Sequence, residues 1–252
     1  MPKQDECLIL IKANPHLSSS HFETVCCAGI GRDGKWRRQY PISFRILDDK
    51  QKFQRWSWIK YDFIEPKNDT RKESQKVQDN SIEIIGKASQ AERTRCLEHL
   101  IFKNFKRPEA EQDSLTLIRP TMSEFYWKPK TPEDIAKLAK KHAGVVSQGS
   151  LFHADARPLI QCPYSFHIKW LDDLGVSHDS TCDDWETSAT FFVRRKTLKS
   201  DDLALQSMAQ TFNVDYPKKG MAMAFSTHSR RHWQWLLVGL LRADHIEQQS
   251  LF

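Results

Sequence analysis

The sequence predicts an α+β fold with a β-rich N-terminal half and a mixed C-terminal half. Apolar and aromatic runs of strand length dominate the first half, and helical periodicity appears mainly later. Strands and helices do not alternate regularly, which argues against a parallel α/β sheet. Hydrophobic residues make up 39% of the 252 residues and aromatic residues 11%. This content is enough for a substantial core, so wholesale disorder is not expected.

The N-terminal half is expected to form a hairpin or a small barrel-like sheet. Residues 7–12 are an apolar run typical of a buried strand, and Asp33-Gly34 suits the turn of a hairpin over residues 21–40. Residues 56–64 are rich in aromatic and β-branched side chains. The polar residues 65–80 are expected to form a loop. The expected strands cover residues 7–12, 21–30, 36–40, 56–64 and 82–85.

In the second half, capping residues mark the expected helices. Ser89 and Glu92 match a capping box, Thr131 precedes a proline at a helix start, and Ser200 precedes two acids. The sequence predicts helices over residues 90–104, 131–144, 183–195 and 200–212, and strands over residues 115–118, 125–127, 164–170, 221–225 and 233–241. The mixed half thus ends with two helices followed by late antiparallel strands.

These elements suggest a division of the chain. We expect a β-rich nucleic-acid-binding domain over residues 1–130 and a helix with a linker over residues 131–158. An α+β domain over residues 159–247 and a short tail over residues 248–252 follow.

The positive charge is concentrated in one stretch. The net charge is +6, and residues 31–60 hold nine basic and three acidic residues, so the remaining 29 basic and 29 acidic side chains cancel. Such asymmetry is typical of a nucleic-acid surface. Aromatic residues such as Trp36 and Trp56 interleave these charges and offer rings for base stacking. Alternatively, the rings are core and the charges solvate a sheet face. The candidate phosphate-binding residues are Arg32, Lys35, Arg37, Arg38, Arg45 and Arg55.

A second basic segment lies between the last two expected strands. Residues 226–233 contain two histidines, two arginines and three hydroxyl groups. Such a loop suits phosphate binding or general acid–base chemistry, although it also fits a solvated turn. His228, Arg230 and Arg231 join the candidate nucleic-acid-binding residues.

Motifs for metal or cofactor chemistry are weak. Cys162, His167, His178 and Cys182 offer zinc-binding groups, but their spacings are not the usual ones, so no metal is expected. The acidic segments 69–74 and 183–186 lack a recognisable nuclease signature, and helix-start acids explain the second. The sequence has no P-loop, Gly-x-Gly-x-x-Gly or Gly-x-Ser-x-Gly motif. No cofactor is expected.

The expected compartment is the cytoplasm. The charged N-terminal residues lack the apolar stretch of a signal peptide, and no apolar run reaches the length of a membrane span. The six cysteines show no repeated spacing and are expected to be reduced. No membrane partner is expected.

One short pattern, Gln-x-Ser-Leu-Phe, occurs twice, one hundred residues apart. It resembles the bacterial sliding-clamp-binding pentapeptide, whose common form is Gln-Leu-Ser/Asp-Leu-Phe. The resemblance covers only these two segments and implies a clamp partner. Leucine and phenylalanine would anchor in an apolar groove, and glutamine would hydrogen bond. Alternatively, the Leu-Phe pairs close a core. The candidate partner-binding residues are Gln148, Leu151, Phe152, Gln248, Ser250, Leu251 and Phe252.

Charge and resemblance together indicate a DNA-binding accessory protein of bacterial replication, repair or defence, recruited by the sliding clamp. Two alternatives stay open at this point. The chain is either a clamp-tethered DNA-processing enzyme, such as a nuclease, or an RNA-binding module in which the pentapeptides are accidental.

Overall fold

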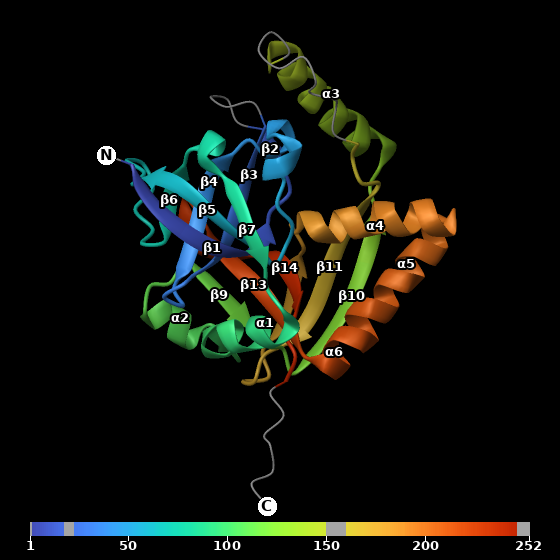
Figure 1. The fold of residues 1–252 in the computed structure, drawn as a ribbon. Helices are drawn as coiled ribbons and strands as arrows, with labels where there is room; N and C mark the ends of the chain where they lie inside the picture. The colour runs from blue at the N-terminus through green and yellow to red at the C-terminus, as the bar shows by residue number, and fades with distance from the viewer. Residues whose placement is uncertain (1, 18–22, 150–159, 246–252) are drawn as a thin grey trace, which may run out of the picture.

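The structure, a computed structural model, describes residues 2–17, 23–149 and 160–245. In this part of the chain, five strands of the N-terminal half close into a barrel in the order β1-β3-β4-β6-β5, with β5 returning to β1 (Figure 1). The short strands β2 and β7 add to β3 and β5. The bounds are β1 Lys3–Lys12, β2 His16–Leu17, β3 Glu23–Gly31, β4 Trp36–Ile42, β5 Ser57–Ile64, β6 Ser74–Val77 and β7 Glu83–Lys87.

The barrel closes around an apolar interior. Inward-facing residues such as Ile9, Cys27, Ile59 and Val77 form one buried cluster. The α+β fold class and the barrel-like N-terminal sheet are therefore confirmed. The loop expected over residues 65–80 is wrong in part, because Ser74–Val77 pairs with β4 and β5 and closes the barrel.

The C-terminal half contributes two further sheets within the described ranges. One has the order β14-β13-β9-β8 and the other β10-β11-β12. The strand bounds are β8 Ile101–Phe102, β9 Leu115–Ile118, β10 Met122–Pro129, β11 Tyr164–Leu171, β12 Ser177–Thr181, β13 Met221–His228 and β14 Arg231–Arg242. Strand β9, from the expected first domain, pairs with β13 from the expected third.

Helices surround these sheets (Figure 1). Their bounds are α1 Gln90–Leu97, α2 Lys106–Ala110, α3 Pro132–Gly149, α4 Trp185–Leu198, α5 Asp201–Gln210 and α6 Tyr216–Lys219, with a π-helical turn over Thr211–Asp215. Phe191, Leu205 and Met208 from α4 and α5 pack on the C-terminal strands in a second cluster. The helix expected over residues 90–104 is too long, because the chain leaves α1 through a 3-10 turn and Ile101 pairs with Leu117.

A third cluster joins the two halves. Leu8 and Ile30 of the barrel pack with Leu117, Ala224 and Leu241 of the C-terminal sheet. The barrel and the sheet β14-β13-β9-β8 therefore share apolar surface, and this packing fixes where the β13–β14 hairpin lies relative to the barrel. No helix of the described residues is long and apolar enough to span a membrane.

Candidate functional site

A polar network is buried where the barrel meets the C-terminal sheet. Arg38 of β4 is 2% exposed. Its Nη2 donates to the carbonyl and Oγ of Ser114 at 2.8 Å, and its Nη1 donates to Ser226 Oγ at 2.9 Å. The backbone N–H and Oγ–H of Ser114 donate to the carboxylate of Glu73. Ser114 therefore bridges a buried guanidinium and a buried carboxylate; we call Arg38, Glu73, Ser114 and Ser226 the Arg38 network.

The expected phosphate-binding role of Arg38 is therefore wrong, because its charge faces the interior. Arg55 fails for the same reason. Its side chain is 14% exposed, and its guanidinium contacts Asp184 Oδ1 at 2.7 Å and donates to the Leu240 carbonyl at 2.9 Å. The acids of segment 183–186 also have structural partners. Asp184 caps α4, and Glu186 pairs with Lys12 at 2.6 Å.

The other basic residues of the first stretch do not form one free basic face. Arg37 pairs with Asp5 at 2.6 Å and Asp33 at 3.1 Å. Arg32 pairs with Glu6 at 2.8 Å, and its guanidinium lies 3.6 Å from the Trp58 ring centroid. Lys35 is exposed in the turn, and Arg45 is half-buried in a 3-10 helix. Three of the candidate arginines of this stretch, Arg32, Arg37 and Arg55, therefore already have carboxylate partners in the fold.

The second basic segment has a different structure. Strand β13 runs to His228 and β14 begins at Arg231, so the expected loop shrinks to a turn of two residues. His228 pairs with Arg231 and Thr227 with Trp235, so the residues between Arg231 and Trp235 bulge out of the ladder. Bulges of this kind re-aim side chains. We call residues 228–234 the hairpin tip.

The hairpin tip exposes cations and an aromatic ring. Arg230, Arg231 and His232 are exposed, and Trp233 is 77% exposed. Within the described residues, neither arginine forms an ion pair, in contrast to Arg37 and Arg55. Burial and then the charges of Arg231, Arg230 and Arg71 lower the pKa of His228. The neighbouring arginines therefore disfavour the charged form of His228.

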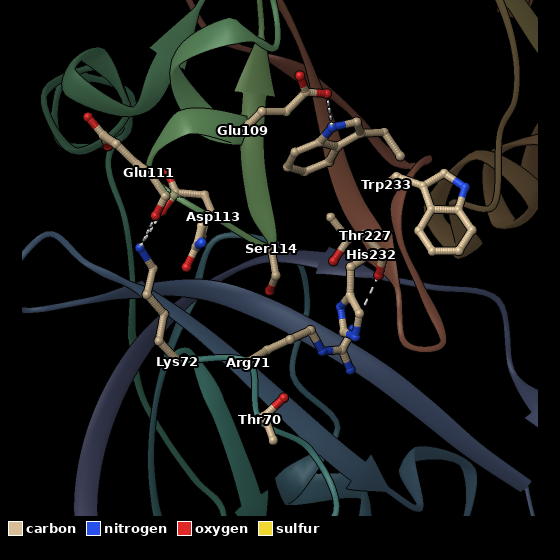
Figure 2. A pocket seen from close by; sticks show the side chains of 12 residues that line it. Thr70, Arg71, Lys72, Glu109, Glu111, Asp113, Ser114, Thr227, His232 and Trp233 are labelled. Carbon is tan, nitrogen blue, oxygen red and sulfur yellow. Dashed lines mark hydrogen bonds and ion pairs between the residues drawn. The ribbon is translucent and has the colours of Figure 1, made fainter.

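A hollow of about 690 Å³ lies beside the hairpin tip (Figure 2). Three segments line it: the loop before β6, the segment from α2 to β9, and the hairpin itself. A second hollow, of about 790 Å³, shares Thr70, Arg71 and His232 with the first. The two hollows therefore border the same three residues, and we call the pair the groove. The residues lining the first hollow are Thr70, Arg71, Lys72, Glu109, Glu111, Gln112, Asp113, Ser114, Thr227, His232, Trp233 and Trp235.

The carboxylates of this hollow each have a partner. Glu109 accepts from Trp235 Nε1 at 3.1 Å, Glu111 pairs with Arg107 at 2.7 Å, and Asp113 pairs with Lys72 at 2.5 Å. They point to different partners rather than to one common point (Figure 2). In the part of the chain that the structure describes, no group of three or more metal-ligating side chains converges.

The zinc candidates are also kept apart. His167 pairs across the ladder with Thr181, and His178 with Trp170. Residues three apart on a strand point to opposite sides. His167 therefore lies on one face of the sheet, against Tyr126, and His178 lies on the other, stacked on Trp170. Cys162 and Cys182 are buried thiols.

Both segments with the clamp-like pattern fall beyond what the structure describes. Gln248, Ser250, Leu251 and Phe252 lie outside the described residues, as do Leu151 and Phe152. Gln148 belongs to the last turn of α3, without a described side chain.

Two family models together match residues 3–252 of the chain. A family described as Domain of unknown function (DUF8757) matches residues 92–252. The chain belongs to this family. A second one, Domain of unknown function (DUF8758), matches residues 3–101. The two matched ranges overlap at residues 92–101, which include most of α1. No curated protein matches the chain.

Several residues of the site were not predicted from the sequence. The sequence places Arg71 and Lys72 in the acidic segment 69–74 and Trp235 in the expected strand 233–241, and it assigns no binding role to any of them. Their role depends on three distant segments that meet beside the hairpin. The one sequence signal was the pair of tryptophans after the two arginines, because a buried antiparallel strand seldom begins with so many polar and aromatic residues together.

Arg71 at the centre of the groove is held by Asp69. The carboxylate of Asp69 binds Arg71 through two oxygens, at 2.8 and 2.7 Å, and Arg71 Nη1 donates to the Thr227 carbonyl. Burial opposes the charge of Asp69, but hydrogen bonds from Arg71 and Ser74 outweigh it and lower the pKa of this carboxyl to about 2. Asp69 thus stabilises the fold only while it is ionised.

This pKa predicts acid sensitivity. A folded-state pKa below the unfolded value gives stability that is present above about pH 4 and is lost as the pH falls towards 2. We expect Asp69→Asn to cost about 2 kcal/mol at pH 6 and to flatten the pH dependence between 4 and 2. Urea unfolding at a series of pH values measures both effects. Parallel curves for the two proteins would rule out this role for Asp69.

Proposed function

We propose that this protein is a DNA-binding accessory factor of bacterial replication, repair or defence, and that the hairpin tip is its DNA-binding surface. The observation that carries the proposal is the combination of Arg230 and Arg231, which lack ion pairs within the described residues, with Trp233, which is 77% exposed. Unpaired guanidinium groups bind phosphates, and an exposed indole stacks on bases. A large exposed aromatic ring gives little folding energy, so binding is the better explanation for it.

The proposed binding surface is the second basic segment and not the first. In the first stretch, carboxylates already neutralise Arg32, Arg37 and Arg55. Phosphates would have to displace these partners. At the hairpin tip no such exchange is needed, so the arginines contribute their full charge to binding. RNA offers the same phosphates and bases, and the binding experiments below therefore include RNA strands.

Clamp recruitment is the second part of the proposal. Its support is the repeated Gln-x-Ser-Leu-Phe pattern at residues 148–152 and 248–252. A protein tethered to a clamp acts at high local concentration of DNA, so modest intrinsic affinity is enough. The six cysteines are free thiols, which supports the cytoplasm as the compartment.

Trp233 provides a first test. We expect Trp233→Ala to weaken binding of a labelled single strand by about 5- to 100-fold, since base–aromatic stacking contributes about 1–3 kcal/mol per base. Trp233→Phe retains an aromatic ring and should retain most of the affinity. Fluorescence anisotropy with DNA and RNA strands measures the effect. Equal affinity of wild type and Trp233→Ala would exclude stacking at this ring.

The clamp pattern gives a separate prediction. Deleting residues 248–252 should weaken binding to the bacterial sliding clamp strongly, because a seated Leu or Phe contributes roughly 1.5–3 kcal/mol before ordering costs. Adding Leu151→Ala and Phe152→Ala should remove what remains. Surface plasmon resonance on immobilised clamp measures both steps. Unchanged clamp binding in the combined variant, or altered binding to bare DNA, would contradict this assignment.

A further inference from the structure

The hollow beside the hairpin tip has a fixed aromatic wall. The indole of Trp235 stacks on Phe105 with ring centroids 5.1 Å apart and 12° between planes. Its Nε1–H donates to Glu109 at 3.1 Å, and both partners belong to α2 or its N-cap. Phe105 therefore covers one face of the Trp235 ring and Glu109 binds its Nε1–H edge, while the ring also lines the hollow. A ring that is already oriented loses little entropy when a flat ligand stacks on it.

The floor of the hollow contains an unsatisfied hydroxyl group. Thr227 is 4% exposed, and its Oγ1 is buried with no hydrogen-bond partner within the described residues. Its backbone is fixed on both sides, because its N–H donates to the Ser114 carbonyl at 2.9 Å and its carbonyl accepts from Arg71 at 3.1 Å. A buried hydroxyl without a partner is costly. A ligand with a polar edge would supply the missing hydrogen bond.

The remaining groups match the edge of a nucleobase. Asp113 and Glu111 keep further carboxylate lone pairs beside their partners Lys72 and Arg107, and the ring of His232 lines the same hollow of about 690 Å³. Volumes of roughly 300–1,000 Å³ are typical of small-molecule sites. A flat aromatic wall with donors and acceptors at the floor suits a heteroaromatic ring better than an aliphatic or purely anionic ligand.

We propose that this hollow receives one unstacked nucleobase, whose ring lies on Trp235 and whose polar edge reaches Thr227. The inference rests on the proposed function and names its substrate class, a single strand with an accessible base. In this proposal the flanking phosphates of the strand bind Arg230 and Arg231, which are exposed on the hairpin beside the hollow. A base inside an intact duplex is paired and stacked and does not reach the hollow.

The test uses short single strands of DNA and of RNA in which one abasic position is moved along the sequence. We expect one position, and not its neighbours two nucleotides away, to lose at least about fivefold in affinity when the base is missing. Thr227→Val, which removes the hydroxyl but keeps the shape, should weaken the intact strand about fivefold. Thr227→Ser should bind like the wild type.

Thr116 provides a matched control. Its Oγ1 is also buried without a partner in the described part of the chain, but Thr116 lies in the core away from the hollow. Thr116→Val should leave binding unchanged. Equal losses for Thr116→Val and Thr227→Val would overturn the inference, and so would equal effects of all abasic positions. If the arginines of the tip matter while Thr227 and the abasic position do not, this inference fails and the proposed function stands. If the wild type binds no strand, the proposed function fails first.

Discussion

Replacing both arginines of the hairpin tip should reduce affinity for single strands on the order of 100-fold at about 0.1 M salt. Arg230 and Arg231 are exposed and form no ion pair within the described residues. Each charge-assisted hydrogen bond to phosphate contributes about 1.5 kcal/mol or more. Two lost contacts should also reduce the slope of log K against log salt by about 1.4, because each neutralised phosphate of a single strand contributes about 0.7.

A matched pair of substitutions controls for net charge. Arg32→Ala with Arg37→Ala removes two positive charges from the β3–β4 hairpin, where Glu6, Asp5 and Asp33 already pair with them. We expect this variant to keep its affinity within about threefold and to keep its salt slope. Anisotropy titrations at four salt concentrations compare the two variants. Equal losses in both would show that net charge alone, and not the hairpin tip, governs binding.

The largest effect on stability is expected at Arg38. Arg38→Met removes the guanidinium from the Arg38 network and leaves the Ser114 carbonyl and the hydroxyl groups of Ser114 and Ser226 without this donor. Each buried acceptor that is left unsatisfied costs about 1–3 kcal/mol. The same change exposes no new surface. We therefore expect a lower midpoint of urea unfolding with an unchanged slope.

A second substitution should restore part of this loss. Arg38 and Glu73 share Ser114 as a partner, so the double variant Arg38→Met/Glu73→Gln should be more stable than the sum of the two single changes predicts. Arg37→Met, at the next position, should cost less than Arg38→Met, because Asp5 keeps a hydrogen bond from Gln75 when Arg37 is removed. A loss below about 1 kcal/mol in Arg38→Met, or strict additivity with Glu73→Gln, would refute the bridging role of Ser114.

Local sequence signals predicted most of the strands and the helix starts. The caps expected at Ser89, Thr131 and Ser200 all form, with side chains that accept from backbone N–H groups. The ends were harder to predict. Helix α1 stops at Leu97 because Ile101 and Phe102 pair with β9, a contact that helical spacing does not encode. The polar segment Ser74–Val77 becomes a strand because the barrel needs it for closure.

The site was predicted in part. The sequence pointed to Arg230 and Arg231, and the structure leaves both without ion pairs in its described part. It also pointed to Arg38, whose burial depends on Ser114 and Ser226, 76 and 188 residues away in the chain. Charge counts along a sequence cannot distinguish a paired arginine from a free one. For the same reason the hollow, built from three distant segments, could not be inferred from the sequence.

Photocrosslinking tests the central claim most directly. A single strand with 5-iodouracil at successive positions would be irradiated with the wild-type protein, and the linked peptides identified by mass spectrometry. If the hairpin tip binds the strand, crosslinks should fall at residues 228–234, with Trp233 or His232 as the main site, and the product should be lost in Arg230→Ala/Arg231→Ala. Crosslinks confined to residues 31–60, or spread without preference over the surface, would contradict the assignment of the hairpin tip as the DNA-binding surface.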